Sequence, residues 1–137
     1  MRNFDFFEHT ADIGIRGYGK TYLEALEGVA RGMFTHICNS SHMDEPLKKK
    51  FEISANTQED LVIRFLNKLI LIFETEHFVP VKYELIQFTP HTLQAILHGD
   101  TLDPAKHPVH AEVKAATYHN LKISQSPDWM IQVIVDV

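Results

Sequence analysis

The sequence is poor in cysteine and has no long hydrophobic run. Cys38 is the single cysteine among 137 residues, so no intramolecular disulfide can form, and its apolar neighbours predict a buried structural thiol. The longest apolar stretch, Leu69 to Phe73, is far too short to span a bilayer. Residues 1–5 turn polar too early for a signal peptide. We therefore expect a cytoplasmic protein with no membrane segment.

Positive charge is also scarce. The formal net charge is -5, and the only basic run is Lys48 to Lys50. A protein that binds RNA through its phosphates usually carries a basic patch, because counterion release drives such binding. Three lysines on an expected strand are more typical of a solvated sheet edge. Strong direct nucleic-acid binding is therefore not expected, and a basic protein partner fits the charge better.

Recognisable catalytic motifs are missing as well. Gly14, Gly17 and Gly19 fall within an expected strand and its exit turn, so they do not form a phosphate-binding loop that opens a helix. No serine has the flanking glycines of a nucleophile elbow. His107 and His110 are close in sequence, but no cysteine or HExxH-like partner accompanies them, which argues against zinc. We assign no catalytic residue and expect the protein not to be an enzyme.

The residues that are present predict two amphipathic helices. A capping box at Thr21 predicts a helix from Tyr22 to Cys38, with apolar residues at helical spacing. An N-cap at Thr57 predicts a second helix that ends near Glu76. The apolar stripe of this second helix leaves Asn67 on the opposite, polar face.

The rest of the chain reads as strands of a single α+β domain over residues 1–137. Hydrophobic residues make up 45% and charged residues 23%, the balance of a globular protein. The order strand, helix, strand, strand occurs twice in outline, which is compatible with one module inserted in another. Strands are expected at residues 4–7, 13–18, 51–54, 82–88, 92–97, 109–115, 118–124 and 129–135.

Two aspartates are candidate metal ligands. Asp12 lies in the connection between the first two strands, and Asp136 follows the last apolar strand and precedes Val137. Each has an ordinary alternative role, as a turn-capping side chain or as a solvated group near a chain end. If the last strand lies beside the first, both carboxylates and the terminal carboxylate of Val137 would converge, and their repulsion would favour a bound cation. Such an all-oxygen site suits calcium first, with magnesium or manganese as alternatives.

His9 is a further candidate for the same place. It precedes Asp12 by three residues and could support the metal ligands, accept a proton or have a structural role only. From the residues alone, the sequence indicates a soluble α+β domain with an acidic metal site and no named activity.

Four segments of the chain resemble the archease family, and together they run nearly its whole length. They are residues 7–15 (FEHTADIGI), residues 19–34 with the start of the first helix, residues 65–70 (FLNKLI), and residues 107–119 followed by Trp129 and residues 133–137. Lys68 departs from the family, which frequently has an acidic residue there, and residues 39–50 match no family motif.

The resemblance implies a fold of two strand-helix-strand-strand modules, one inserted in the other, with mostly antiparallel sheets and two main helices. It implies that the protein assists an RtcB-type RNA ligase, which joins tRNA exon ends with manganese and GTP, by promoting formation of the ligase–GMP intermediate and repeated turnover. The family's metal site carries over onto Asp12, Asp136 and Val137. Other residues within family motifs are possible partner contacts, namely Glu8, His9, Lys114 and His119.

Two other functions are considered beside this one. A metal-dependent phosphoester hydrolase would use Asp12, Asp136 and His9, although the sequence shows no nucleophile or phosphate-binding loop for it. A general chaperone or adaptor would need no chemistry, and its carboxylates would only keep the strand ends solvated. Metal-dependent turnover by the protein alone would favour the hydrolase, and absence of metal binding would favour the adaptor.

Overall fold

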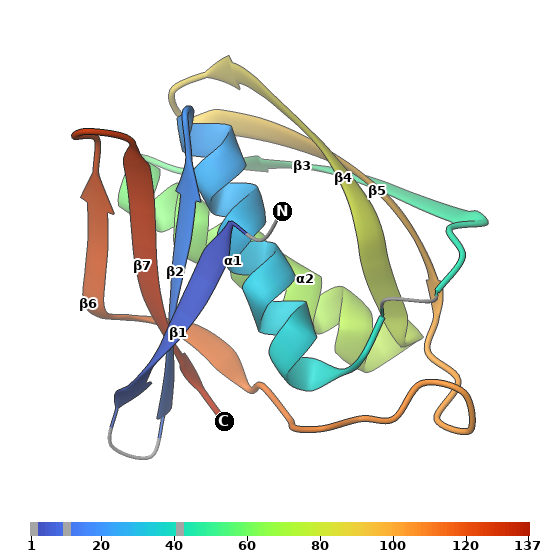
Figure 1. Ribbon diagram of the computed structural model, residues 1–137. Coiled ribbons are helices and arrows are strands. Elements are labelled where there is room, and N and C mark those ends of the chain that lie inside the picture. The colour runs from blue at the N-terminus through green and yellow to red at the C-terminus, as the bar shows by residue number, and fades with distance from the viewer. Residues whose placement is uncertain (1–2, 10–11, 41–42) are drawn as a thin grey trace.

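The described residues, 3–9, 12–40 and 43–137, form two antiparallel sheets with two helices between them (Figure 1). The coordinates are a computed structural model. They confirm the expected α+β class, with two helices and antiparallel sheets. The elements are β1 (Phe4–His9), β2 (Asp12–Gly19), α1 (Tyr22–Ile37), β3 (Leu47–Ser54), α2 (Gln58–Glu76), β4 (Phe78–Thr89), β5 (Thr92–Thr101), β6 (Ala115–Ser124) and β7 (Trp129–Asp136).

Both helices begin at the threonines that the sequence indicates. The Thr21 hydroxyl accepts a hydrogen bond from the Glu24 N–H at 3.1 Å, but the Glu24 carboxylate accepts from Lys20 N–H at 2.9 Å, outside the usual capping box. Thr57 caps α2 in the same way, accepting from the N–H of Asp60 at 3.0 Å. The expected helix starts are therefore confirmed, and each has a side-chain acceptor for a backbone donor that lacks a helical partner.

The helix ends also agree with expectation to within a residue. Cys38 is the C-cap of α1, and its N–H donates to the carbonyl of Phe34. Helix α2 ends at Glu76 because His77 adopts a left-handed conformation, with φ of 57°, and donates its N–H to Phe73.

The two sheets repeat one topology. In the module β2-α1-β6-β7 the strand order is β2-β7-β6, and in the module β3-α2-β4-β5 it is β3-β5-β4. The last strand of each module therefore lies between the other two, and the second module is inserted between α1 and β6 of the first. Strand β1 extends the first sheet beyond β2. This arrangement confirms the inserted-module fold that the resemblance implies.

The hydrophobic core lies between the sheets and surrounds the helices. Helix α1 packs on β1, β2 and β7 and also reaches β4, whereas α2 packs on β6 and on all strands of the second sheet. Each fully buried large apolar side chain contributes about 1.5–3 kcal/mol to stability. Such side chains come from both helices and both sheets, for example Ile15, Leu26, Phe34, Phe65, Leu66, Phe78, Leu93 and Leu97.

Cys38 belongs to this core, as the sequence predicts. It is 1% exposed, and burial raises the pKa of its thiol above the ordinary value. A thiol that resists ionisation is a poor nucleophile, which fits a structural role. Neither described helix has the length and apolar character needed to cross a membrane.

The expected strand over residues 109–115 is wrong. Val109 makes one isolated bridge to Cys38, and β6 begins only at Ala115. The N–H groups of His110 and Ala111 instead donate to the carbonyl of Ile37, at 2.7 and 3.4 Å. These residues therefore satisfy a backbone acceptor at the end of α1 and are held there by backbone hydrogen bonds rather than by a strand ladder.

Close approach of α1 to β2 depends on Gly17. A Cβ atom at this position would lie 2.1 Å from the carbonyl oxygen of Ala25 and 2.5 Å from the backbone nitrogen of Val29. Both atoms belong to the helix backbone, which cannot move aside as a side chain could. Any side chain at Gly17 must push α1 away from the sheet.

We expect Gly17→Ala to lower the free energy of unfolding by about 1–3 kcal/mol, the usual cost of overpacking a core. Urea denaturation followed by circular dichroism measures this change. The matched control is Ser124→Ala on the exposed end of β6, which should change stability by less than about 0.5 kcal/mol. Equal stability of Gly17→Ala and the wild type would contradict the tight contact of α1 with β2.

Candidate functional site

The strand register brings the two candidate aspartates together at one end of the four-stranded sheet. His9 pairs with Asp12 across β1 and β2, and Asp12 pairs with Asp136 across β2 and β7. Asp136 in turn pairs with Ala115 at the start of β6. The Cα atoms of four strands thus form one row at the lower end of the sheet in Figure 1, where β2 begins and β7 ends.

Asp12 and Asp136 project from the same face of the sheet because they are direct cross-strand partners. Their Cβ atoms are therefore expected about 4.5–5.5 Å apart. The alternate residues Ile13 and Val135 pack into the core beside α1, so the aspartates are on the face directed away from the helices. Asp12 is half-buried and Asp136 is exposed.

Two carboxylates placed directly opposite each other repel. Among the described residues, no lysine, arginine or histidine forms an ion pair with Asp136. A divalent cation bound between the two carboxylates would relieve this repulsion.

The sheet under the aspartates is well packed on this outer face. The ring of Phe7 lies over Gly14, where an added Cβ would be 2.2 Å from its Cζ atom. The Arg16 guanidinium stacks 4.3 Å above the centre of the same ring. Ile134, the register partner of Gly14, is fully buried. These contacts give Asp12 and Asp136 a rigid base two residues away on each strand.

A chain of hydrogen bonds fixes the irregular part of β6 to the same face. Arg16 Nε donates to Gln132 Oε1 at 3.0 Å, and Gln132 Nε2 donates to the carbonyl of Asn120 at 2.9 Å. Asn120 has a positive φ of 52° and lies in a bulge of β6 opposite β7, between Thr117 and Lys122. Gln132 is the one buried polar side chain recorded in the described part of the chain, and both ends of its amide are bonded.

The remaining predicted site residues fall in different places. His9 ends β1 beside Asp12, and Glu8 precedes it opposite Ile13. The backbone N–H of Lys114 donates to the carbonyl of Asp136 at 2.8 Å, so Lys114 adjoins the row, with its side chain exposed. His119 lies apart, exposed in the bulge of β6.

The described side chains supply two carboxylates for a cation and no more. No group of three His, Cys, Asp or Glu side chains able to hold a metal occurs among the residues that the structure describes. Val137, which follows Asp136 directly, is 40% exposed. Calcium takes about six to eight oxygen ligands and keeps waters readily, so the two aspartates are a chemically suitable but open donor set.

Asn67 of α2 supports this end of the sheet. The sequence analysis does not identify this role, because it places Asn67 on the polar face of the helix. Its Oδ1 accepts from the backbone N–H of Ala116 at 2.8 Å, and its Nδ2 donates to the Ala116 carbonyl at 3.4 Å. Strand β6 is at the edge of its sheet, so the amide of Asn67 replaces a neighbouring strand. Ala116 is 5% exposed and follows Ala115, the register partner of Asp136.

Comparison with known proteins gives a consistent result over the whole chain. The model of the archease protein family matches residues 4–137. Proteins named archease from Pyrococcus abyssi and Pyrococcus furiosus are 39% and 38% identical to this chain, with all of both chains covered.

Two solved structures have the same fold. The solution structure of Methanobacterium thermoautotrophicum protein 1598 is 27% identical and matches with a TM-score of 0.83 over all of both chains. A Thermotoga maritima crystal structure, described as an archease and possible chaperone, has a TM-score of 0.66 at 23% identity and covers 96% of this chain and 94% of its own. At that identity the likeness to the Thermotoga protein concerns the fold.

We expect Asn67→Leu to lower the free energy of unfolding by about 1–3 kcal/mol, because it leaves the buried N–H and carbonyl of Ala116 without partners. Asn67→Asp should cost less, since it keeps the acceptor for the N–H. Glu74→Leu, at an exposed position on the same helix, is the control and should change stability by less than about 0.5 kcal/mol. If urea denaturation shows that Asn67→Leu changes the free energy of unfolding no more than Glu74→Leu does, the amide of Asn67 does not hold β6.

Proposed function

This chain belongs to the archease family, and from that membership we propose that it is a metal-binding accessory protein that activates an RtcB-type RNA ligase. The family match over residues 4–137 supports the partner. The cross-strand pairing of Asp12 with Asp136, next to Val137, is the observation that carries the metal site. In this proposal the protein has no catalytic residue of its own, and the ligase performs the reaction.

The proposed site holds a divalent cation through Asp12, Asp136 and the terminal carboxylate of Val137. All three are hard oxygen donors, which suits calcium, and magnesium or manganese also fit. A bound cation would supply positive charge at the end of the sheet, where anionic groups of the ligase's nucleotide could be accommodated. The cross-strand pair would hold its two carboxylates in a fixed relation, because Phe7, Gly14 and Ile134 pack beneath them.

The accessory protein would act by position and charge. Its outer sheet face is well packed, so it can present the cross-strand pair Asp12 and Asp136, here called the aspartate row, to the ligase without a large ordering cost. Orientation of GTP or of the ligase's guanylylated residue is the step that such a surface could favour. His9, Lys114 and Glu8 adjoin the row and are candidate contacts to the ligase, whereas His119 would contact it from the bulge of β6.

The acidic overall charge also fits a protein partner better than RNA. With a formal net charge of -5, the chain would be repelled by nucleic-acid phosphates at long range. A general chaperone is the main alternative, because the Thermotoga relative is described as a possible chaperone. A chaperone would act on unrelated unfolded proteins and would not depend on Asp136. A phosphoester hydrolase would instead turn over substrate without any ligase.

We expect calcium to bind the wild type and to raise its melting temperature, because a ligand of the folded state stabilises it. Asp136→Asn should weaken binding tenfold or more, or about 1.4 kcal/mol, since one of two aspartate ligands is lost. Without metal, this variant should be as stable as the wild type or more so, because the repulsion with Asp12 is removed. Titration calorimetry and thermal unfolding measure both effects.

The control for the metal experiment is Asp128→Asn. Asp128 is exposed and precedes β7 at the opposite end of the same strand, so the substitution removes an equal charge from the same sheet. Calcium should bind this variant as it binds the wild type. Equal binding by Asp136→Asn and Asp128→Asn would remove the aspartate row as the metal site.

We expect the wild type to accelerate guanylylation of a purified RtcB-type ligase and to allow multiple turnovers of RNA joining. Asp136→Ala, or a short extension after Val137, should fold normally and lose this stimulation, because each alters the proposed donor set. Labelled GMP incorporation into the ligase and single-turnover against multiple-turnover ligation are the measurements. Undiminished stimulation by both variants would exclude the site, and phosphoester turnover by the protein alone would favour the hydrolase.

A further inference from the structure

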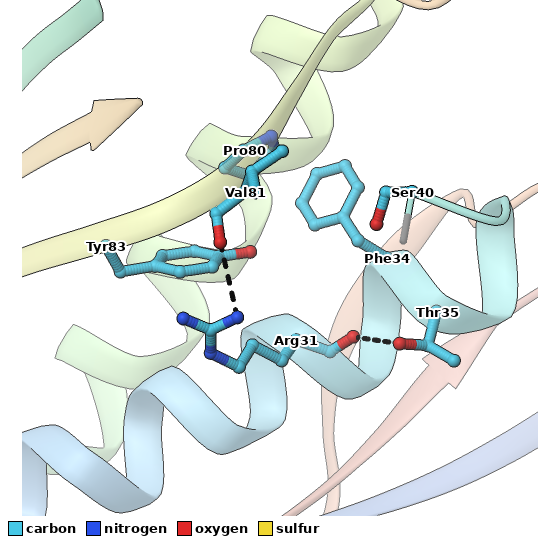
Figure 2. A pocket seen from close by; sticks show the side chains of 7 residues that line it. All are labelled: Arg31, Phe34, Thr35, Ser40, Pro80, Val81 and Tyr83. Carbon is cyan, nitrogen blue, oxygen red and sulfur yellow. Dashed lines mark hydrogen bonds between the residues drawn. The ribbon is translucent and has the colours of Figure 1, made fainter. Parts of the chain in front are cut away.

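A cavity with polar groups in its lining lies between the C-terminal half of α1 and the beginning of β4, and it shares no residue with the aspartate row (Figure 2). Its volume is about 180 Å³. A water molecule occupies about 30 Å³ of liquid, and drug-sized ligands need about 300–1,000 Å³, so the cavity suits a ligand of a few heavy atoms. The lining residues are Arg31, Phe34, Thr35, Ser40, Pro80, Val81 and Tyr83.

The hydroxyl of Tyr83 is the most informative group in this cavity. Tyr83 is 7% exposed, and its oxygen is buried without a hydrogen-bond partner among the described residues. Figure 2 shows the hydroxyl end of the ring directed toward the space between Val81 and Phe34. A buried hydroxyl without a partner is costly, so the fold would gain from an acceptor placed there.

Tyr83 is a neutral donor under ordinary conditions. Burial raises the pKa of its phenol well above the ordinary value, and the nearby Arg31 only partly opposes this effect. The hydroxyl therefore keeps its proton and can donate a hydrogen bond to an acceptor in the cavity. A neutral phenol offers no negative charge that would attract a cation.

Arg31 adds a second, oriented donor. Its Nε donates to Glu27 at 2.8 Å and its Nη1 donates to the carbonyl of Val81 at 3.2 Å. The guanidinium also stacks 5.1 Å from the centre of the Tyr83 ring. These contacts hold the planar group in place and use two of its five N–H bonds.

The other polar groups of the lining agree with an acceptor ligand. Ser40 adds a hydroxyl across the cavity from Tyr83, as Figure 2 shows, while the Thr35 hydroxyl already donates to the carbonyl of Arg31 at 2.8 Å. The carbonyl of Val81 already accepts from Arg31. None of the described lining residues is acidic. The available groups are therefore mainly donors, and one of them belongs to the Arg31 guanidinium, whose charge is shared with the Glu27 carboxylate.

We infer that this cavity is a binding site for a small oxyanion of the phosphate or carboxylate class, held by the Tyr83 hydroxyl, the Arg31 guanidinium and the Ser40 hydroxyl. Guanidinium and hydroxyl donors match the oxygens of both classes. Phe34, Pro80 and Val81 shield one side of the site from water, which strengthens these hydrogen bonds. The site is independent of the proposed ligase activation, since no residue of the aspartate row contributes to it.

The test is thermal unfolding and titration calorimetry of the full chain with sodium phosphate and with sodium acetate, each against sodium chloride at equal ionic strength. The wild type should show a rise in melting temperature and measurable binding with phosphate, acetate or both. Tyr83→Phe should bind the same anion about tenfold more weakly or worse, the effect of losing one buried hydrogen bond. Ser40→Ala should weaken binding in the same direction.

Tyr22→Phe is the matched control for removal of a buried tyrosine hydroxyl. The Tyr22 hydroxyl has a partner, since it donates to the carbonyl of Gln58 at 3.0 Å, and it lies outside the cavity. This variant should have a lower melting temperature than the wild type in sodium chloride, but the anion should still raise its melting temperature. Tyr83→Phe should show the opposite pattern, with an unchanged or higher melting temperature in chloride and no anion response.

The separate anions identify the ligand class. A response to phosphate alone would support the phosphate class, and a response to acetate alone would support the carboxylate class. A wild type that responds no more to either anion than to chloride would overturn the inference. The same holds if Tyr83→Phe binds as the wild type does, because the anion would then lie elsewhere.

Discussion

The antiparallel pairing of β2 with β7 is the interaction on which the rest of the structure depends. It joins residues near the two ends of the chain along the whole of both strands, from Asp12 with Asp136 to Gly19 with Trp129. This long-range pairing closes the first module around the inserted β3-α2-β4-β5 module. It also creates the aspartate row, because the register that buries Ile15 and Val133 in the core places Asp12 opposite Asp136. A shift of β7 by one residue would direct Asp136 toward α1 and leave Asp12 on the outer face, so the two carboxylates would separate.

The elements around this pairing stabilise it from both faces and from the edge. On the inner face, α1 approaches β2 closely at Gly17. On the outer face, Arg16 and Gln132 connect β2 to β7 and to the bulge of β6. At the edge, Asn67 of α2 satisfies both backbone groups of Ala116. The inserted module therefore contributes to the aspartate row through α2, although it supplies no ligand to it.

Part of this structure could be predicted from the sequence, and the physical reason is locality. The helix starts follow from Thr21 and Thr57, whose capping bonds are made within three residues of chain. The expected strand from Val109 to Ala115 is wrong, because its backbone bonds to the end of α1, a distant segment that the alternation of residue types does not reveal. The meeting of Asp12 with Asp136 could be posed only as a hypothesis, since strand neighbours far apart in sequence leave no local signal. Asn67 and Tyr83 were missed for a similar reason, because each acts through a partner or cavity formed by distant residues.

Paramagnetic manganese tests most directly whether the aspartate row binds a divalent cation. Addition of small amounts of manganese to the isotope-labelled protein broadens the backbone amide signals nearest the ion. Our account predicts that signals of residues 12–14, 114–116 and 135–137 disappear first, because the register places these segments side by side. Broadening that begins in another part of the chain, or that is uniform over the protein, would contradict it.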